Sequence, residues 1–285
     1  MKIKANMKKE ATDFPVLMKI IRVVVPKSIR GIVGVWLISK LSKWWWVVRL
    51  YTFLLYGKES VKFRPIGDGN VAYNYKGRDV IAPRNAIPIF VEIFHEEIYD
   101  KRFKPDGVVV DIGAFVGMYA VKASFYAKEV IAVEPCPETF EMLKVNCKGL
   151  KNIHLAKVAL WSESGKAKLY MGTANLGTTP IWGGNSLILE RSNYYDKDDY
   201  IEVDMTTLDE LLGKPVSFIK IDTEGAEVEI LKGAEKTLAN PGVKLAVAAY
   251  HKLANGEPEL PYLISFLEER KYKVRTDGDF LYAEN

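Results

Sequence analysis

The stretch Val108-Val-Val-Asp-Ile-Gly-Ala-Phe-Val-Gly117 decides the fold. Its first half is an apolar, β-branched run typical of a buried strand, and its second half carries Gly113 and Gly117, where a strand turns into a helix. The same order recurs directly afterwards, with a strand expected over 129–134 and a helix over 137–148. Alternating strand–helix units predict a mostly parallel sheet with helices on both faces.

The remaining pattern completes an α/β protein. Helices are expected over 88–103, 226–239 and 259–270, and further strands over 152–161, 216–222 and 243–250. Residues 162–200 form a long excursion, and two short strands should flank the Asp277-Gly278 turn. We therefore expect a Rossmann-like sheet that is mostly parallel, with a C-terminal antiparallel hairpin.

Charge divides the 285 residues into unlike parts. Residues 1–58 hold 12 Lys/Arg against 2 acids, together with four of the six tryptophans, whereas residues 59–285 carry a net negative charge. We expect a basic, Trp-rich helical extension over 1–58, a small β element and helix over 59–104, and the catalytic domain over 105–285.

Composition also excludes some classes of function. A body with net negative charge argues against a nucleic-acid binder, because the folded surface of such a protein is itself basic. Cys136 and Cys147 have neither disulfide nor zinc-type spacing, and no apolar run at the start reads as a cleavable signal. A reducing cytoplasm is therefore the expected location.

Two acids identify the kind of cofactor. Asp111 lies at the end of the first core strand and Glu134 at the end of the second. A carboxylate beside the glycine loop repels a phosphate but suits the ammonium of a methionine moiety, and Glu134 can accept both hydroxyls of a ribose. A ligand with a cation at one end, hydroxyls at the other and no phosphate between them describes S-adenosylmethionine.

Three runs resemble the FkbM-type methyltransferase family: DIGAFVG (111–117), AVEPCPETFEMLKVN (132–146) and FIKIDTEGAEVEILKGAEKTL (218–238). The resemblance implies a class I methyltransferase sheet and O-methylation, often of hydroxyls on sugars or other secondary metabolites. The residues expected to bind the cofactor are Asp111, Gly113, Ala114, Gly117, Glu134, Pro135 and Ala159.

The candidate catalytic residues follow the fourth and fifth strands. By strand alternation, Lys220 and Asp222 share one face, and we expect them to pair. Glu224 is a weaker candidate, for binding the acceptor. His251 ends the fifth strand and is the expected general base, with a structural role as the alternative, while Tyr250 should alternate away from the site.

The long excursion contains Gly183-Gly-Asn-Ser-Leu187, in which Asn185 and Ser186 are weak candidates for binding the acceptor or the cofactor. A plain turn explains them equally well. No set of His, Asp and Glu has convincing metal-ligand spacing, so we expect no metal.

The extension suggests a membrane surface. Basic residues beside tryptophan and leucine over 14–58 fit a helix lying in the membrane interface, at the inner face if the protein is cytoplasmic. Helices packed on the catalytic domain or on a second copy are the alternative, and the oligomeric state stays open.

The expected function is O-methylation of a sugar, a glycolipid or a related small molecule. RNA methylation and a catalytically silent S-adenosylmethionine-binding scaffold at a membrane are its rivals.

Overall fold

The computed structural model describes residues 63–67, 69–172, 184–188, 197–253 and 255–285. The chain divides into two units, residues 1–72 and 73–285, and the second contains the central sheet. The expected extension over 1–58 lies outside the described residues. Within the described ranges, no helix has both the length and the hydropathy needed to cross a membrane.

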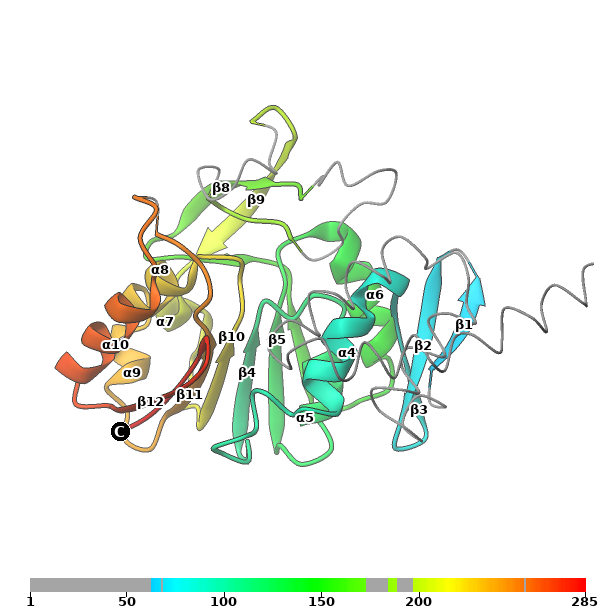
Figure 1. The fold of residues 1–285 in the computed structure, drawn as a ribbon, viewed down its shortest axis with the longest axis horizontal. Coiled ribbons are helices and arrows are strands. Elements are labelled where there is room, and N and C mark those ends of the chain that lie inside the picture. Colours follow the sequence, from blue (N-terminus) through cyan, green and yellow to red (C-terminus); the bar gives the residue numbers. More distant parts are fainter. Residues whose placement is uncertain (1–62, 68, 173–183, 189–196, 254) are drawn as a thin grey trace, which may run out of the picture. The chain divides into compact units, whose positions relative to one another are not determined.

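Seven strands form the central sheet, in the order β12-β13-β11-β10-β4-β5-β6 (Figure 1). Strands β11, β10, β4, β5 and β6 pair in parallel, and β13 pairs antiparallel with both β11 and β12. The mostly parallel sheet with a C-terminal antiparallel hairpin is thus confirmed. The strands are β4 (Val108–Ile112), β5 (Glu129–Val133), β6 (Ile153–Ala156), β10 (Phe218–Ile221), β11 (Lys244–Ala248), β12 (Lys273–Asp277) and β13 (Phe280–Glu284).

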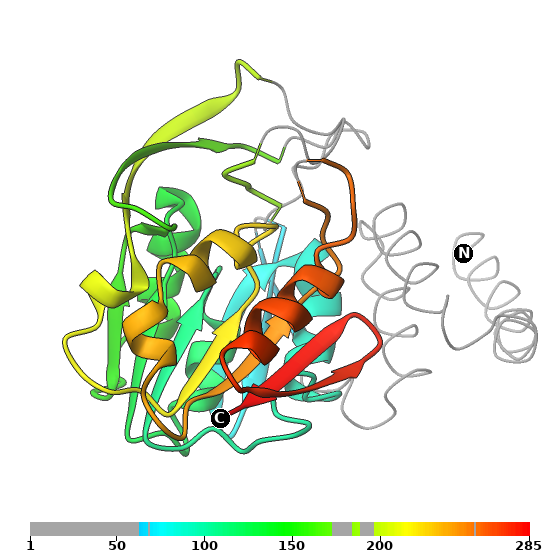
Figure 2. The same cartoon turned by 90° about the vertical axis from the view of Figure 1, so that its left-hand side faces the viewer.

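Helices cover both faces of this sheet, which explains why its central strands are mostly apolar, with the paired Lys220 and Asp111 as the exceptions in β10 and β4. Strand β10 is buried at all of its positions, and β4 at all but the first. Helices α5 and α6 lie on one face and α8, α9 and α10 on the other (Figures 1 and 2). The helices are η2 (Arg84–Ala86), α4 (Ile87–Phe94), α5 (Met118–Ala123), α6 (Pro137–Cys147), α7 (Leu208–Leu211), α8 (Glu227–Lys232), α9 (Glu235–Leu238) and α10 (Leu260–Glu269).

Two smaller sheets accompany the central one. Strands β1 (Phe63–Gly67), β2 (Asn70–Tyr75) and β3 (Arg78–Pro83) form the first, in that order, at the β element expected from sequence. The second has the order β7-β9-β8 and comes from the long excursion: β7 (Ala159–Leu160), β8 (Gly165–Tyr170) and β9 (Tyr200–Thr206). An isolated bridge between Tyr170 and Ser186 joins the segment 184–188 to this second sheet.

The helix expected over 88–103 is shorter in the structure, because ion pairs with a buried lysine require a different backbone conformation after Phe94. Helix α4 ends at Phe94, and Glu97 adopts a left-handed φ of 51°. The buried ammonium of Lys122 lies 3.1 Å from a carboxylate oxygen of Glu97 and 2.6 Å from one of Asp100. Since these pairs require the two acids to turn back toward α5, the apolar pattern beyond Phe94 does not continue as a helix.

Two other expected elements are divided. The strand expected over 152–161 ends at Ala156, and Ala159–Leu160 pair instead with β9. The helix expected over 226–239 is broken into α8 and α9 at Gly233. A Cβ at Gly233 would lie 2.1 Å from the carbonyl oxygen of Trp161, so the break brings the two backbones into close contact.

Candidate active site

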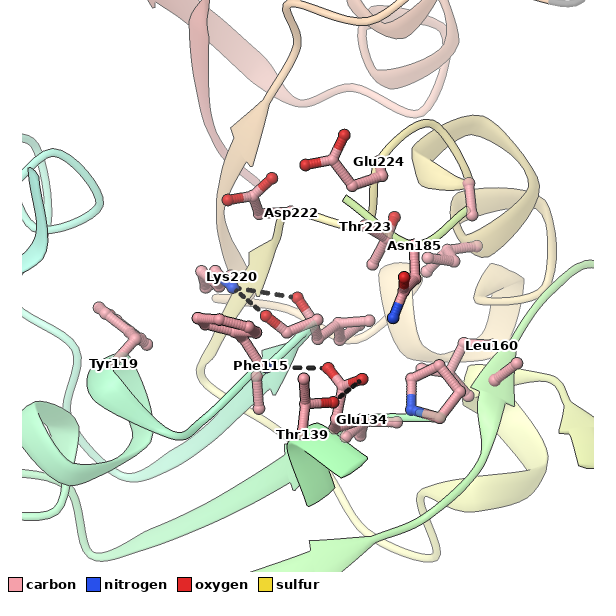
Figure 3. A pocket seen from close by; sticks show the side chains of 18 of the residues that line it. Phe115, Tyr119, Glu134, Thr139, Leu160, Asn185, Lys220, Asp222, Thr223 and Glu224 are labelled. Carbon is pink, nitrogen blue, oxygen red and sulfur yellow. Dashed lines mark hydrogen bonds between the residues drawn. The ribbon is translucent and has the colours of Figure 1, made fainter. Parts of the chain in front are cut away.

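A pocket opens at the carboxyl ends of β4, β5 and β10, where ligands bind in sheets of this kind (Figure 3). The predicted site residues that line it are Gly113, Ala114, Glu134, Pro135, Ala159, Asn185, Lys220, Asp222 and Glu224. The predicted residues that do not line it are Asp111, Gly117, Ser186 and His251.

Lys220 and Asp111 form a buried ion pair beneath the pocket. The register of β10 and β4 sets the two residues side by side, with Nζ of Lys220 3.0 Å from Oδ1 of Asp111. Burial raises the pKa of Asp111, and the Lys220 charge opposes that rise. The structure therefore corrects two expectations: Lys220 pairs with Asp111 rather than Asp222, and the cation facing Asp111 is Lys220 rather than the ammonium of a ligand.

The same ammonium fixes the glycine loop. Nζ of Lys220 donates to the carbonyl oxygens of Ile112 at 3.2 Å and Gly113 at 2.7 Å (Figure 3). Gly113 has φ of 71°, and a Cβ there would lie 1.8 Å from the backbone oxygen of Asp222. Gly117 has φ of 88°, and a Cβ there would lie 2.5 Å from a leucine side chain of α6. Both glycines are thus required by the packing of the loop itself.

Glu134 is held at the end of β5 by three donors (Figure 3). The Phe115 N–H donates to Oε2 at 2.9 Å, while the Cys136 N–H and the Thr139 hydroxyl donate to Oε1 at 3.0 and 2.8 Å. Burial raises the pKa of Glu134 to about 7, against the opposing effect of these hydrogen bonds. A carboxylate has about four acceptor positions, so Oε2 keeps capacity for a ligand hydroxyl.

The wall around Glu134 is apolar. It comes from the end of β5, from the segment that leaves β6, and from β8 and its neighbouring loop. Such a slot suits a flat, weakly polar ring, and one carboxylate beside it would orient a hydroxylated group. Its apolar members are Val133, Pro135, Val158, Ala159, Leu160, Leu169 and Leu187.

Asp222 lies at the other side of the pocket, and its carboxylate accepts hydrogen bonds from two phenol hydroxyls. Tyr99 donates to Oδ2 at 2.6 Å and Tyr250 donates to Oδ1 at 3.1 Å. Burial, followed by the Asp222 charge, raises the pKa of Tyr99 well above its ordinary value, so this phenol keeps its proton and acts as a donor. The expectation that Tyr250 turns away from the site is wrong, since its side chain lines the pocket.

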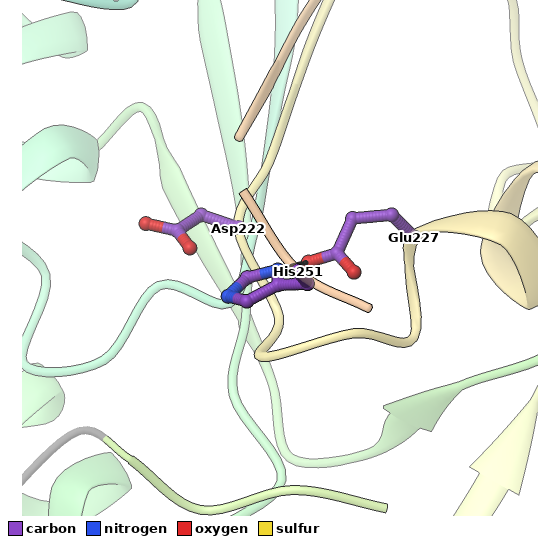
Figure 4. A group of neighbouring side chains, drawn as sticks. All are labelled: Asp222, Glu227 and His251. Carbon is purple, nitrogen blue, oxygen red and sulfur yellow. Dashed lines mark ion pairs between the residues drawn. The ribbon is translucent and has the colours of Figure 1, made fainter. Parts of the chain in front are cut away.

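The His251 ring lies between Asp222 and Glu227 (Figure 4), and His251 itself does not line the pocket. Strand β11 ends at Ala248, so strand alternation does not extend to this residue. Its Nδ1 lies 3.2 Å from Glu227 and 3.3 Å from Glu259, and its Nε2 lies 3.5 Å from Glu224. Its side chain is only 5% exposed.

These contacts fix the charge of His251. Burial opposes the shift, but Glu224, Glu227 and Glu259 together raise the pKa of His251 to about 11. Likewise, burial opposes the charge on Glu227, but His251 lowers the pKa of Glu227 to about 2. An imidazolium has no free lone pair to accept a proton. The contacts of His251 therefore favour the structural alternative over the role of general base.

One atom each of Asp222, Glu227 and His251 lies within 4.8 Å of the other two, a spacing that a metal ion could use. The two ring nitrogens, however, face different carboxylates, with Nδ1 toward Glu227 and Nε2 toward Glu224. The arrangement is therefore explained by an imidazolium held between carboxylates.

The two weak candidates of the excursion have different positions. Asn185 lines the pocket, and its Oδ1 accepts from the Gly172 N–H at 2.9 Å. Ser186 is buried beneath it, and its hydroxyl donates to the backbone oxygen of Glu224 at 2.9 Å. Ser186 thus supports the turn of Glu224, which itself lines the pocket with a φ of 56°.

Several residues of the pocket were not found from sequence. Thr139 sits five residues after Glu134 in the first turn of α6, a position typical of capping groups, so a signal existed. Tyr99 and Glu92 come from the segment before β4, and no motif marks them. Only the folded chain brings them to the strand ends.

The sheet order, the antiparallel C-terminal hairpin and a pocket at the strand ends define a Rossmann-like protein of the class I methyltransferase type. Residues 111–274 match the Methyltransferase FkbM domain, and the chain belongs to this methyltransferase family.

Two curated relatives and one solved structure are similar to it. Methyltransferase 1 of Beauveria bassiana is 28% identical over 52% of this chain and 66% of its own length, just under two thirds. Methyltransferase sdnD of Sordaria araneosa is 26% identical over 52% of this chain and 68% of its own. The crystal structure of methyltransferase FkbM from Methylobacillus flagellatus covers 70% of this chain and 54% of its own, with 16% identity and a TM-score of 0.44.

Proposed function

We propose that this chain is an S-adenosylmethionine-dependent O-methyltransferase acting on a hydroxyl of a sugar, a glycolipid or a related small molecule. S-Adenosylmethionine supplies an activated methyl group. The observation that carries the proposal is Glu134, whose Oε2 keeps acceptor capacity beside an apolar slot. This combination suits the ribose and adenine of an adenosine.

The charges of the pocket favour this cofactor over a dinucleotide. Lys220 is the only cation among the described residues of the lining, and its ammonium is already occupied by Asp111 and two carbonyl oxygens. A pyrophosphate would therefore have no free cation there. Asp222 and Glu224 instead offer negative charge, which suits the sulfonium and ammonium of S-adenosylmethionine.

The residues of the pocket hold the glycine loop and the Asp222 carboxylate in fixed positions. Lys220 holds the glycine loop, and Tyr99 and Tyr250 hold Asp222 in one orientation toward the pocket. In-line displacement at a methyl carbon gains most from fixed geometry, so a rigid pocket wall is the expected contribution of the protein.

A lipid-linked acceptor is the part of the proposal that accounts for the N-terminal composition. Methyl transfer itself gives no reason for the 12 basic residues and four tryptophans of 1–58, whereas contact with a membrane surface would concentrate enzyme and acceptor together. We accordingly propose a cytoplasmic protein with peripheral contact at the inner face of the membrane.

Calorimetry tests the cofactor. Replacing Glu134 by alanine should weaken S-adenosylmethionine binding by about 1.5–3 kcal/mol, the usual contribution of a charged hydrogen bond. Glu138→Ala is the matched control, since Glu138 is an exposed acid in the first turn of α6, the helix that follows Glu134. Equal affinity for Glu134→Ala and the parent, or competitive binding of NADH at similar affinity, would reject the assignment.

Mass spectrometry tests the acceptor. Glycolipids and glycans extracted from a deletion strain should contain a species lighter by one CH₂, which purified protein and S-adenosylmethionine convert back. Methylation of purified RNA with a steep salt dependence would instead support the rival substrate.

A further inference from the structure

His251, the general base expected from sequence, and the other catalytic candidates, Lys220 and Asp222, each have partners within the protein. His251 is held among Glu224, Glu227 and Glu259 and does not line the pocket, and the ammonium of Lys220 is held by Asp111 and the glycine loop. Each oxygen of Asp222 accepts a phenol hydrogen bond. Asp222 keeps further acceptor positions, but the two phenols hold its direction, and transfer to a hydroxyl oxygen needs a proton acceptor that can reach that hydroxyl.

Glu92 is a carboxylate of the same pocket that no motif marked. It lies on α4 and lines the pocket together with Tyr99, Asp222 and Tyr250. Its side chain is exposed, and no hydrogen bond or ion pair joins its carboxylate to any other described residue. With none of its acceptor positions used within the described residues, Glu92 is free to contact an incoming hydroxyl.

The backbone that carries Glu92 is firmly held. The buried Lys122 ammonium donates to the carbonyl oxygen of Ile93 at 2.8 Å, and the same ammonium pairs with Asp100. On the neighbouring turn, the aromatic ring of Phe94 stacks on Tyr73 with centroids 4.9 Å apart. These contacts fix the backbone from which the Glu92 side chain reaches the pocket.

The charges around Glu92 favour a carboxylate that can gain and lose a proton near neutrality. Desolvation in the pocket wall, followed by the charges of Asp222 and Glu96, raises the pKa of Glu92 to about 7. Tyr99 and Tyr250 are the other titratable groups whose protonation is coupled to the Glu92 charge. Water also reaches the exposed side chain and weakens this rise in the pKa of Glu92.

We propose that Glu92 is the general base that accepts the hydroxyl proton of the methyl acceptor. The hydroxyl oxygen forms its bond to the methyl carbon, the carbon–sulfur bond breaks with its electron pair going to sulfur, and the proton goes to the Glu92 carboxylate. Water then takes up that proton. This inference rests on the proposed function and adds a residue outside the family-matched segment 111–274.

The test is substrate-free and compares two ligands that differ in charge. S-Adenosylmethionine carries a positive sulfur, and S-adenosylhomocysteine carries a neutral one. If Glu92 faces the transferred methyl group, its pKa should be lower in the first complex than in the second, by on the order of one unit for charges several ångströms apart. Carboxyl-¹³C glutamate NMR of the full chain measures this, and Glu92→Gln identifies the resonance by its loss.

The outcomes separate the two proposals. An elevated pKa of Glu92 in the free protein, together with the difference between complexes, supports the general base. If both ligands bind but leave Glu92 with the same pKa, this inference is overturned while the proposed function stands. If neither ligand binds the parent, the proposed function fails, and the inference fails with it.

Discussion

His251 shows how one residue can set the pH dependence of stability. Its pKa of about 11 lies above the ordinary 6.5, because the folded state surrounds it with carboxylates. A raised basic group contributes stability that is fully present below pH 6.5 and is lost as pH rises toward 11. Glu227, with its pKa lowered to about 2, contributes stability above its ordinary 4.5 that is lost as pH falls toward 2.

We therefore expect His251→Gln to destabilise the protein by about 3–5 kcal/mol near neutral pH, because it leaves buried carboxylates without their cation. Urea unfolding between pH 6.5 and 10 should show the parent losing stability with rising pH and the variant losing much less. His154→Gln is the control: this histidine is 63% exposed and should cost under about 0.5 kcal/mol. Parallel stability curves for parent and His251→Gln would contradict the assignment.

The same residue marks the limit of what sequence could predict at the site. Glu134 and Asp222 were found because each directly follows an apolar strand, and the structure places both at the pocket. The partner of Lys220 could not be found, since it depends on the register between β10 and β4. The sequence pattern predicted His251 at the site and Tyr250 away from it, but the structure has the reverse. Strand β11 ends at Ala248, so strand alternation does not apply to these two residues, and no local pattern marks that strand end.

At the scale of elements, the periodic apolar runs predicted the central sheet well, because its strands are covered on both faces and read as continuous hydrophobic stretches. Boundaries set by distant contacts were less predictable. The division of α8 from α9 depends on Gly233 meeting the backbone of Trp161, more than 70 residues earlier in the chain.

This contact makes a direct prediction. Gly233→Ala should destabilise the protein by about 1–3 kcal/mol, because its Cβ would lie 2.1 Å from the Trp161 carbonyl oxygen and the backbone must shift. Gly213→Ala is the matched control, since Gly213 is exposed and a Cβ there meets nothing within 4 Å. Urea denaturation of the two variants measures the difference. Equal midpoints would show that the helix is divided for another reason.

At the scale of the whole molecule, the described catalytic unit and the N-terminal extension differ in charge. The catalytic unit has an acidic pocket wall formed by Glu92, Asp222 and Glu224, whereas residues 1–58 carry 12 basic residues and 2 acids. The acidic pocket wall therefore favours cationic ligands, whereas the basic composition of residues 1–58 favours anionic ones. This separation is the physical reason to test membrane contact on the extension alone and acceptor binding on the pocket alone.

The full-length protein should sediment with vesicles that contain anionic lipid, and much less with neutral vesicles. Each basic residue near an anionic surface contributes on the order of 1 kcal/mol, and the attraction is screened within about 8 Å at physiological salt. Reversing the charge of Lys40 and Lys43 beside Trp44 should therefore weaken partitioning about tenfold or more at low salt. The same double reversal at the exposed Lys128 and Lys151 of the catalytic unit is the matched control and should have little effect.

If both pairs reduce sedimentation equally, net charge alone attracts the protein to the vesicle. If the parent ignores anionic vesicles at low salt, the extension packs on protein instead, and a second copy or the catalytic unit becomes its expected partner.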